Sequence, residues 1–229
     1  MKKNLAFLLI ASLCACINLQ AQNRTAPQLD PTVERLLGGN QNFSGNVETS
    51  VSINGQSNMS ISGKMYYSEK KLHYEINLGG GAPQFAQQLA KSGMDKMTAI
   101  VLPEQHTMYL AYPRKGCYVE MPLPDRKDAT NNPTPKITEV GAEVIDGHKC
   151  IKNKVEIKKP DGEVLTSYVW LATDLNKFPI KVEVSTTTTK VVTQFKDISL
   201  QKPAADLFTA PAGLTKYASM QEMFAAPQK

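Results

Sequence analysis

Apolar and polar residues alternate along the first half of the chain. They alternate from Val47 to Ile53, the pair Asn54-Gly55 follows, and residues 59–67 alternate again. Strict alternation is typical of half-buried strands, and Asn-Gly favours a two-residue hairpin turn. The pattern therefore predicts an antiparallel hairpin, which a third alternating stretch over 71–78 extends.

The spacing of apolar residues changes after Gly79-Gly80-Gly81. Pro83 begins a segment whose apolar side chains recur with helical spacing, opposite a polar face of Gln, Lys and Asp. This spacing predicts one amphipathic helix over 83–97, inserted among strands. Its apolar stripe is Phe85, Ala86, Leu89, Ala90, Met94 and Met97.

The remainder of the chain reads as strands joined by short turns. Two stretches are apolar on both faces, and a polar segment over 124–135 precedes a run of hairpins with turns such as Asp146-Gly147. No helical crossover separates these strands, which excludes a parallel nucleotide-binding sheet. The fold class expected is mainly β with a few helices, with about ten or eleven antiparallel strands. The further strands are 98–102, 106–112, 117–123, 137–145, 148–158, 163–172, 180–187 and 190–200, and short helices are expected at 204–208 and 219–224.

The N-terminus has the layout of an export signal. Two lysines precede an apolar stretch from Leu5 to Leu19, and Ala21 offers a cleavage site, so residues 1–21 are expected to be a signal peptide. The segment Leu13-Cys14-Ala15-Cys16 also resembles a lipobox, in which Cys16 would carry the lipid, and this alternative stays open. We expect a lead with a short helix over 22–42 and a single domain over 43–224, located in the periplasm or at an outer membrane.

Charge argues against a nucleic-acid partner. The 229 residues carry a formal net charge of +5, and removing Lys2 and Lys3 leaves 24 basic against 21 acidic residues, or +3. Five lysines gather over 149–159 without interleaved aromatic residues, so they do not form a single-strand binding pattern. A solvated strand face is expected there, with contact to an anionic membrane surface as the alternative.

Two cysteines, Cys117 and Cys150, remain after the predicted cleavage. An even pair in an oxidising compartment predicts a disulfide between them. Two buried free thiols are the alternative.

Motifs of catalysis and cofactor binding are missing from the sequence. It contains no phosphate-binding loop, dinucleotide fingerprint, zincin motif or nucleophile elbow, and its three histidines are His73, His106 and His148. We therefore expect no catalytic residue, no cofactor and no metal site.

A set of apolar side chains is the candidate binding site. Eight methionines remain after export, and methionine adapts to varied apolar shapes because its side chain is flexible and polarizable. The alternative is that these side chains only fill a core. The candidate wall or lid comprises Phe85, Leu89, Met94, Met97, Met108, Leu110 and Trp170.

Three motifs carry a resemblance to a known family. They are Gly141-x-x-Val144-x-x-Gly147-His148-Lys149-Cys150, the stretch from Trp170 to Asp174 that leads to Phe178-Pro179, and Leu207-Phe208-x-x-Pro211-x-Gly213 with Tyr217 beyond. With them the chain resembles uncharacterised bacterial envelope domains related to the LolA/LolB lipoprotein carriers. The resemblance implies an open half-barrel whose apolar concave face holds acyl chains, with the helix over 83–97 as a lid.

One feature of the carriers is missing. The carriers resemble one another in using an arginine in the first strands of the sheet to hold the lid closed. The arginines of this chain all lie outside the strands expected over 43–78; they are Arg24, Arg35, Arg114 and Arg126. The carriers' release mechanism is therefore not implied. We expect a non-enzymatic exported protein that binds an acyl chain, a lipid or another apolar ligand. The alternative is an envelope interaction or structural protein with a filled core.

Overall fold

A computed structural model describes residues 39–80, 83–123, 135–158, 162 and 164–226. The predicted signal peptide, Cys16 and most of the expected lead over 22–42 lie outside these residues, as does most of the polar segment 124–135. The strands in chain order are β1 (Asn42–Ile53), β2 (Gln56–Ser68), β3 (Lys71–Asn77), β4 (Lys96–Leu102), β5 (Thr107–Tyr112), β6 (Cys117–Pro122), β7 (Lys136–Ile145), β8 (His148–Lys158), β9 (Val164–Ala172), β10 (Phe178–Ser185), β11 (Thr189–Ser199) and β12 (Thr215–Tyr217).

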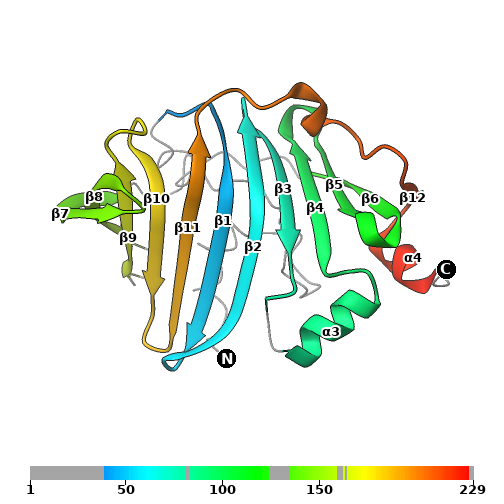
Figure 1. The fold of residues 1–229 in the computed structure, drawn as a ribbon, viewed down its shortest axis with the longest axis horizontal. Coiled ribbons are helices and arrows are strands. Elements are labelled where there is room, and N and C mark those ends of the chain that lie inside the picture. Colours follow the sequence, from blue (N-terminus) through cyan, green and yellow to red (C-terminus); the bar gives the residue numbers. More distant parts are fainter. Residues whose placement is uncertain (1–38, 81–82, 124–134, 159–161, 163, 227–229) are drawn as a thin grey trace.

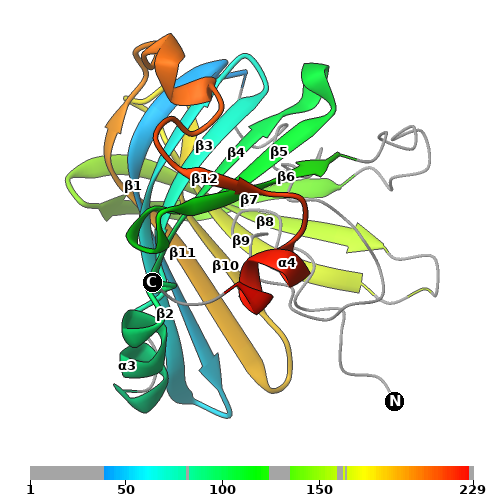
Figure 2. The ribbon, with the colours of Figure 1, turned by 90° about the vertical axis from the view of Figure 1, so that its right-hand side faces the viewer.

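These strands form one sheet in the order β12-β6-β5-β4-β3-β2-β1-β11-β10-β9-β8-β7 (Figure 1). All neighbours pair antiparallel except β12, which runs parallel to β6. Both ends of the sheet bend to the same side and do not meet (Figure 2). The predicted open antiparallel half-barrel is confirmed. The three-residue β12 was not expected, because so short a segment shows no alternation.

Two hairpin turns follow directly from the sequence. Asn54 and Gly55 have φ values of 52° and 79°, and Asp146 and Gly147 have values of 48° and 84°. A two-residue turn with positive φ at both positions matches the right-handed twist of the strands on either side. These turns set the register of β1 with β2 and of β7 with β8.

The centre of the sheet is a pairing between distant parts of the chain. β1 lies between β2 and β11, so that Val47 faces Phe195 and Thr49 faces Thr193. The hydroxyl groups of Thr49 and Thr193 are 3.0 Å apart and share a hydrogen bond. In contrast, β6 and β7 follow one another in the sequence but lie near opposite ends of the sheet.

The main apolar core lies on the concave side of the sheet. We call it the concave core; it contains twenty buried side chains, and Met223 from the C-terminal helix α4 (Met220–Ala225) is one of them. Figure 2 shows α4 on this side. The members are Phe43, Val47, Ile61, Met65, Tyr67, Leu72, Tyr74, Ile76, Met97, Ala99, Val101, Met108, Leu110, Tyr112, Cys117, Val119, Leu123, Phe178, Phe195 and Met223.

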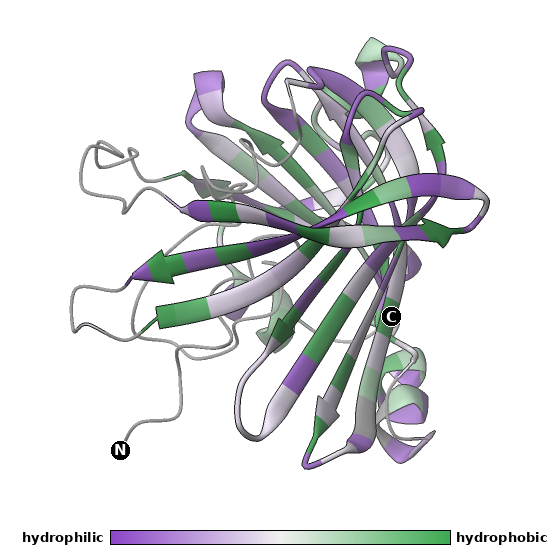
Figure 3. Ribbon diagram, turned by 90° about the vertical axis from the view of Figure 1, so that its left-hand side faces the viewer, coloured by the Kyte–Doolittle hydropathy of each residue, from purple (hydrophilic) through white to green (hydrophobic). Residues whose placement is uncertain are grey.

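The convex face carries the alternate positions of the same strands, as the banding of hydropathy along the ribbon illustrates (Figure 3). Its central part is polar, whereas Ile100 and Leu102 pack under Phe208 of the 3-10 helix η4 (Ala205–Phe208). Two shorter 3-10 turns, η1 (Pro103–Gln105) and η2 (Pro113–Lys115), join β4 to β5 and β5 to β6. The strand alternation thus separates an apolar concave side from a mainly polar convex side.

The inserted helix is shorter than expected. Helix α3 spans Pro83–Lys91 rather than 83–97. The Ser92 hydroxyl donates to the carbonyls of Gln88 and Leu89, and Gly93 adopts φ 69°, which ends the helix. Met97 therefore belongs to β4. Figures 1 and 2 place α3 beyond the ends of β3 and β4, at the margin of the sheet, away from the concave core.

Membrane insertion by a helix finds no support in the described part of the chain. None of its helices combines the length and the apolarity that crossing a bilayer requires.

Candidate ligand-binding site

The structure brings three of the predicted site residues together on the concave face. Met97 lies on β4, and Met108 and Leu110 lie on the neighbouring strand β5. Their side chains are between 1% and 9% exposed and belong to the concave core. Met94, in the link between α3 and β4, packs against this core. Alternation placed Met108 and Leu110 on one face of their strand, as the structure has them, whereas Met97 was assigned to the helix over 83–97.

Methionine is concentrated on this face. Met65, Met97, Met108 and Met223 are members of the concave core. The other four methionines that follow Met1 pack against it, and they are Met59, Met94, Met121 and Met220. The three smaller apolar clusters of the described chain contain none. All eight thioethers thus gather around one apolar surface.

The other predicted site residues lie elsewhere. Leu89 is a half-buried residue of α3, and the side chain of Phe85 lies outside the described part of the structure. Trp170 is buried on the convex side of β9, in a cluster with Cys150, Ala172 and Ile180. The sequence could not place Trp170 relative to the methionines, because its strand is distant from β4 and β5 in the sheet order.

Trp170 lies between two lysines. The ammonium groups of Lys152 and Lys181 are 4.8 and 4.4 Å from the centre of its ring, a cation–π arrangement. The hydrogen bond that Lys152 donates to Glu143, on the neighbouring strand β7, lowers the pKa of Glu143. These contacts tie β7 through β10 together, so Trp170 has a structural role on the convex face.

The predicted disulfide between Cys117 and Cys150 is wrong. Both cysteines are free, buried thiols. Cys117 belongs to β6 and Cys150 to β8, which occupy the second and the eleventh places in the sheet order. The two residues therefore belong to separate apolar clusters, and no bond can join them without rebuilding the sheet.

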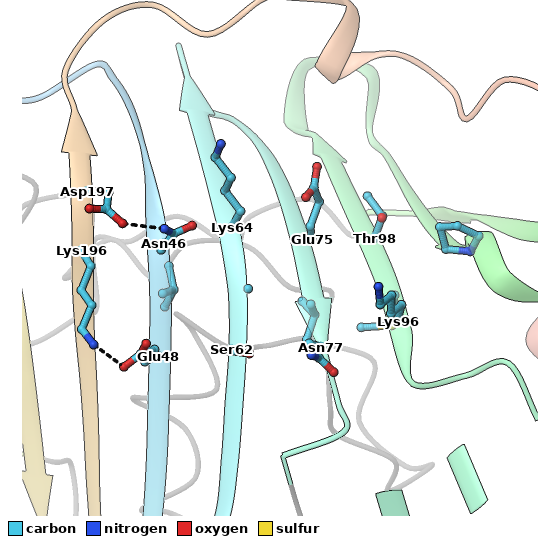
Figure 4. A pocket seen from close by; sticks show the side chains of 15 residues that line it. Asn46, Glu48, Ser62, Lys64, Glu75, Asn77, Lys96, Thr98, Lys196 and Asp197 are labelled. Carbon is cyan, nitrogen blue, oxygen red and sulfur yellow. Dashed lines mark hydrogen bonds and ion pairs between the residues drawn. The ribbon is translucent and has the colours of Figure 1, made fainter. Parts of the chain in front are cut away.

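A polar groove of about 660 Å³ crosses the centre of the convex face (Figure 4). Its floor contains Gly63, and three lysines face three carboxylates around it. Two contacts hold its left side: Lys196 pairs with Glu48 at 2.7 Å, and the Asn46 amide donates to Asp197 at 2.7 Å. The remaining charged groups of the groove are Lys64, Glu75 and Lys96.

The sequence did not indicate this groove. Its polar residues occupy solvent-facing positions of β1 to β4 and β11, with Asp197 at a bulge of β11. Alternation alone does not distinguish such positions from other exposed strand positions. Its charges cancel and its lining contains neither histidine nor cysteine. The arrangement provides hydrogen bonds and ion pairs but no nucleophile with an adjacent base.

The histidines have structural partners. His148 Nδ1 donates to Asp174 at 2.7 Å, a hydrogen bond that lowers the pKa of Asp174, and His73 Nδ1 lies 2.6 Å from the Leu207 carbonyl oxygen. Within the described ranges, no three His, Cys, Asp or Glu side chains gather in the manner of metal ligands.

Comparison with protein families gives one match. The model for Domain of unknown function (DUF4412) matches residues 43–178, more than half of the chain. The chain belongs to this family. The match begins in β1 and ends at the first residue of β10, so β11 lies outside it. The search against curated proteins finds no match.

Several solved structures are similar in fold. A chain of the Pseudomonas aeruginosa MucA/MucB complex is 13% identical, with 80% of this chain and 62% of that chain covered and a TM-score of 0.46. LprF from Mycobacterium bovis is 14% identical, with 77% and 99% covered and a TM-score of 0.39. A LolA superfamily protein from Nitrosomonas europaea is 10% identical, with 78% and 96% covered and a TM-score of 0.32.

A LolA superfamily protein is thus among the structures found. The chain spans only 62% of the length of the chain from the MucA/MucB complex. These similarities concern the fold alone.

Proposed function

We propose that this DUF4412 protein is a non-catalytic binding protein of the bacterial cell envelope, and that it holds an acyl chain, a lipid or another apolar ligand on the concave face of its sheet. The observation that carries the proposal is the gathering of all eight methionines after Met1 at the concave core. The expected signal peptide over 1–21 supports the envelope location.

Methionine suits a surface that must accept ligands of different shapes. It has three rotatable bonds and a polarizable sulfur, so it repacks at little cost, whereas branched side chains hold one conformation. A core that needs only stability is better filled by leucine, isoleucine and valine. The concentration of methionine on one face, and its absence from the three smaller clusters, is therefore typical of a binding surface.

Binding fits the chemistry of the molecule better than catalysis does. The convex groove carries as many lysines as carboxylates, among which Lys196 pairs with Glu48, and His148 is hydrogen-bonded to Asp174. Both cysteines are buried, and burial raises the pKa of each thiol, which keeps it protonated and unreactive at neutral pH. Among the described residues no group has the setting of a nucleophile.

A second candidate function is that of an envelope interaction or structural protein with a filled core. The observation that favours it is the near-complete burial of Met97, Met108 and Leu110 by the protein's own residues. In that case the methionines pack against one another, and the concave face has no space for a ligand. The two candidates differ in what the isolated protein carries.

The test is native mass spectrometry of the full chain purified from its own host's envelope without detergent, followed by solvent extraction. We expect a fatty acyl or phospholipid mass at about one per chain. A protein that is free of lipid and also refuses added fatty acid would contradict the proposal and leave the second candidate.

Variants on one strand localise the site. Met108 and Tyr109 are neighbours on β5 that lie on opposite faces of the sheet. Met108→Gln places a polar amide on the concave face and is expected to reduce occupancy about tenfold, the equivalent of one lost apolar contact of about 1.4 kcal/mol. Met108→Leu keeps the volume and the apolarity, so it should retain the ligand.

Tyr109→Phe is the matched control on the convex face. Thermal unfolding of each variant shows whether a loss of ligand reflects a loss of fold. Equal occupancy in Met108→Gln and the wild type, with both folded, would place the ligand elsewhere.

A further inference from the structure

The margin of the sheet at β7 is the most exposed apolar region of the described chain. Nine of the ten residues of β7 are exposed. Of the six large apolar side chains that are exposed in the described residues, Ile137, Val140 and Val144 lie on this strand, and Val144 is 69% exposed. Exposed apolar side chains gathered at one margin mark a place of contact with an apolar partner.

Part of this margin belongs to the concave face. The register of β7 with β8 places Ile137 opposite Val155 and Ala142 opposite Ile151. A bulge between Glu139 and Gly141 shifts the alternation by one residue, so that Ile137, Ala142 and Val144 share the concave side. Val155 is buried there with 1% exposure.

Two rows of paired residues connect this margin with the interior of the sheet. One row runs from Ala142 through Ile151 and Leu171 to Pro179, which follows Phe178 of the concave core along β10. The other begins at Ile137 and crosses β8 to β2, with one serine among apolar residues. Its members are Ile137, Val155, Ser167, Val184, Val191, Val51 and Met59.

A single unpaired cation lies at the start of the first row. Lys149 faces Val144 across β7 and β8, on the concave side, and is exposed. Its backbone is held in place, because the Thr173 amide and hydroxyl both donate to its carbonyl, at 2.9 and 3.0 Å. Its ammonium forms no ion pair with a described carboxylate, since nearby Asp174 accepts from His148.

The other acidic groups of the margin are occupied or distant. Glu143 points to the convex side, where it pairs with Lys152 at 3.1 Å. Glu139 shares the concave side but lies five positions from Val144 along a strand that rises about 3.3 Å per residue. Lys149 is therefore free to bind an anion beside an apolar surface.

We propose that the β7 margin is the portal through which an anionic acyl lipid reaches the concave face. Its head group contacts the Lys149 ammonium, and its chain lies along Ala142, Ile151, Leu171 and Pro179. This inference rests on the proposed function and adds the charge of the ligand and its path. The two features that carry it are an exposed apolar margin that continues into the core and one unpaired lysine beside it.

The experiment measures the transfer of fluorescent stearate, and separately of its uncharged methyl ester, from phosphatidylcholine vesicles to the full chain by stopped-flow fluorescence. Lys149→Gln removes the charge and should weaken binding of the acid about tenfold while leaving the ester unchanged, as expected for one lost charge-assisted contact. Val144→Glu should slow transfer of both probes, because it places a charge on their path.

The chain offers matched controls on the opposite face. Lys158 is an exposed lysine of β8, and Val164, 51% exposed, faces it from β9 on the convex side. Lys158→Gln and Val164→Glu should leave both probes unaffected. All four positions are exposed, so their substitution is compatible with folding, which circular dichroism verifies.

The outcomes separate the two proposals. If the wild type takes up neither probe, the proposed function fails and the portal fails with it. If the wild type loads stearate and the variants at Lys149 and Val144 behave as their controls do, the portal is overturned while the binding function stands. If the control at Lys158 weakens stearate binding equally, general surface charge explains the effect, and the role of Lys149 is also overturned.

Discussion

The thiols of Cys117 and Cys150 show at the residue scale how burial governs reactivity. Each side chain is 2% exposed, and desolvation raises the pKa of each thiol. We expect a thiol reagent to modify neither cysteine rapidly in the native chain at pH 8, and to modify both after denaturation in urea. Absorbance assays with an aromatic disulfide reagent measure this. Rapid modification of either thiol in the native chain would contradict the structure.

The same shift gives stability a pH dependence. The native state keeps these protons at a pH where the unfolded state has lost them, so the free energy of unfolding falls as pH rises above about 8.5, the ordinary pKa of a thiol. Urea denaturation on either side of that pH measures the slope. In the double variant Cys117→Ala and Cys150→Ala, the contribution of the two thiols to this pH dependence of the free energy of unfolding should disappear.

The cysteines also show why a residue count does not give a pairing. The even number of cysteines and the expected oxidising compartment favoured a disulfide between Cys117 and Cys150. The distance between their two strands, however, depends on the order of the strands in the sheet. That order is set by pairings such as β1 with β11, which no local pattern encodes. By contrast, the shared face of Met108 and Leu110 followed from alternation within their own strand, whereas Met97 was assigned to the helix over 83–97 and lies on β4.

At the scale of elements, local chemistry determined which boundaries could be foreseen. The hairpin turns at Asn54-Gly55 and Asp146-Gly147 were predicted, because two positive φ values in succession require such residues. The end of α3 was not, because Met94 and Met97 happen to continue its apolar spacing. The Ser92 hydroxyl and the left-handed Gly93 end the helix instead.

Helix α4 is short and depends on its N-terminal cap. The Ser219 hydroxyl accepts from the Glu222 amide at 3.1 Å, and the Glu222 carboxylate accepts from the Ala218 amide at 2.8 Å, which resembles a capping box. The helix carries Met223, which is fully buried in the concave core. The cap therefore helps to keep a methionine of the proposed binding surface in place.

We expect Ser219→Ala to loosen α4 while the sheet stays intact. Loss of the cap costs about 1 kcal/mol, which corresponds to about fivefold faster hydrogen exchange at the amides of Met223 and Ala226. Hydrogen exchange followed by mass spectrometry measures this, and Ser60→Ala, at an exposed position of β2, is the control. Unchanged exchange in the Ser219 variant would mean that packing of Met223 alone holds the helix.

At the scale of the whole molecule, one strand joins the two halves of the sheet. β11 pairs with β1 on one side and with β10 on the other, so it connects β2 to β6 with β7 to β10. Its Phe195 packs edge to face against Phe178 and Phe43, whose ring centres are 5.3 and 6.2 Å away. The family match at residues 43–178 does not include this strand.

A fragment that ends with the family match should therefore fail to fold. Residues 22–178 lack β11, so the open edges of β1 and β9 expose backbone groups, and the Phe43 ring loses Phe195, one of its aromatic packing partners. We expect no cooperative thermal transition and poorly dispersed amide signals in NMR. The control is residues 22–214, which lack only β12 and α4 at one end of the sheet and should unfold cooperatively at a lowered temperature. A cooperative transition in the shorter fragment would show that the two halves of the sheet do not depend on β11.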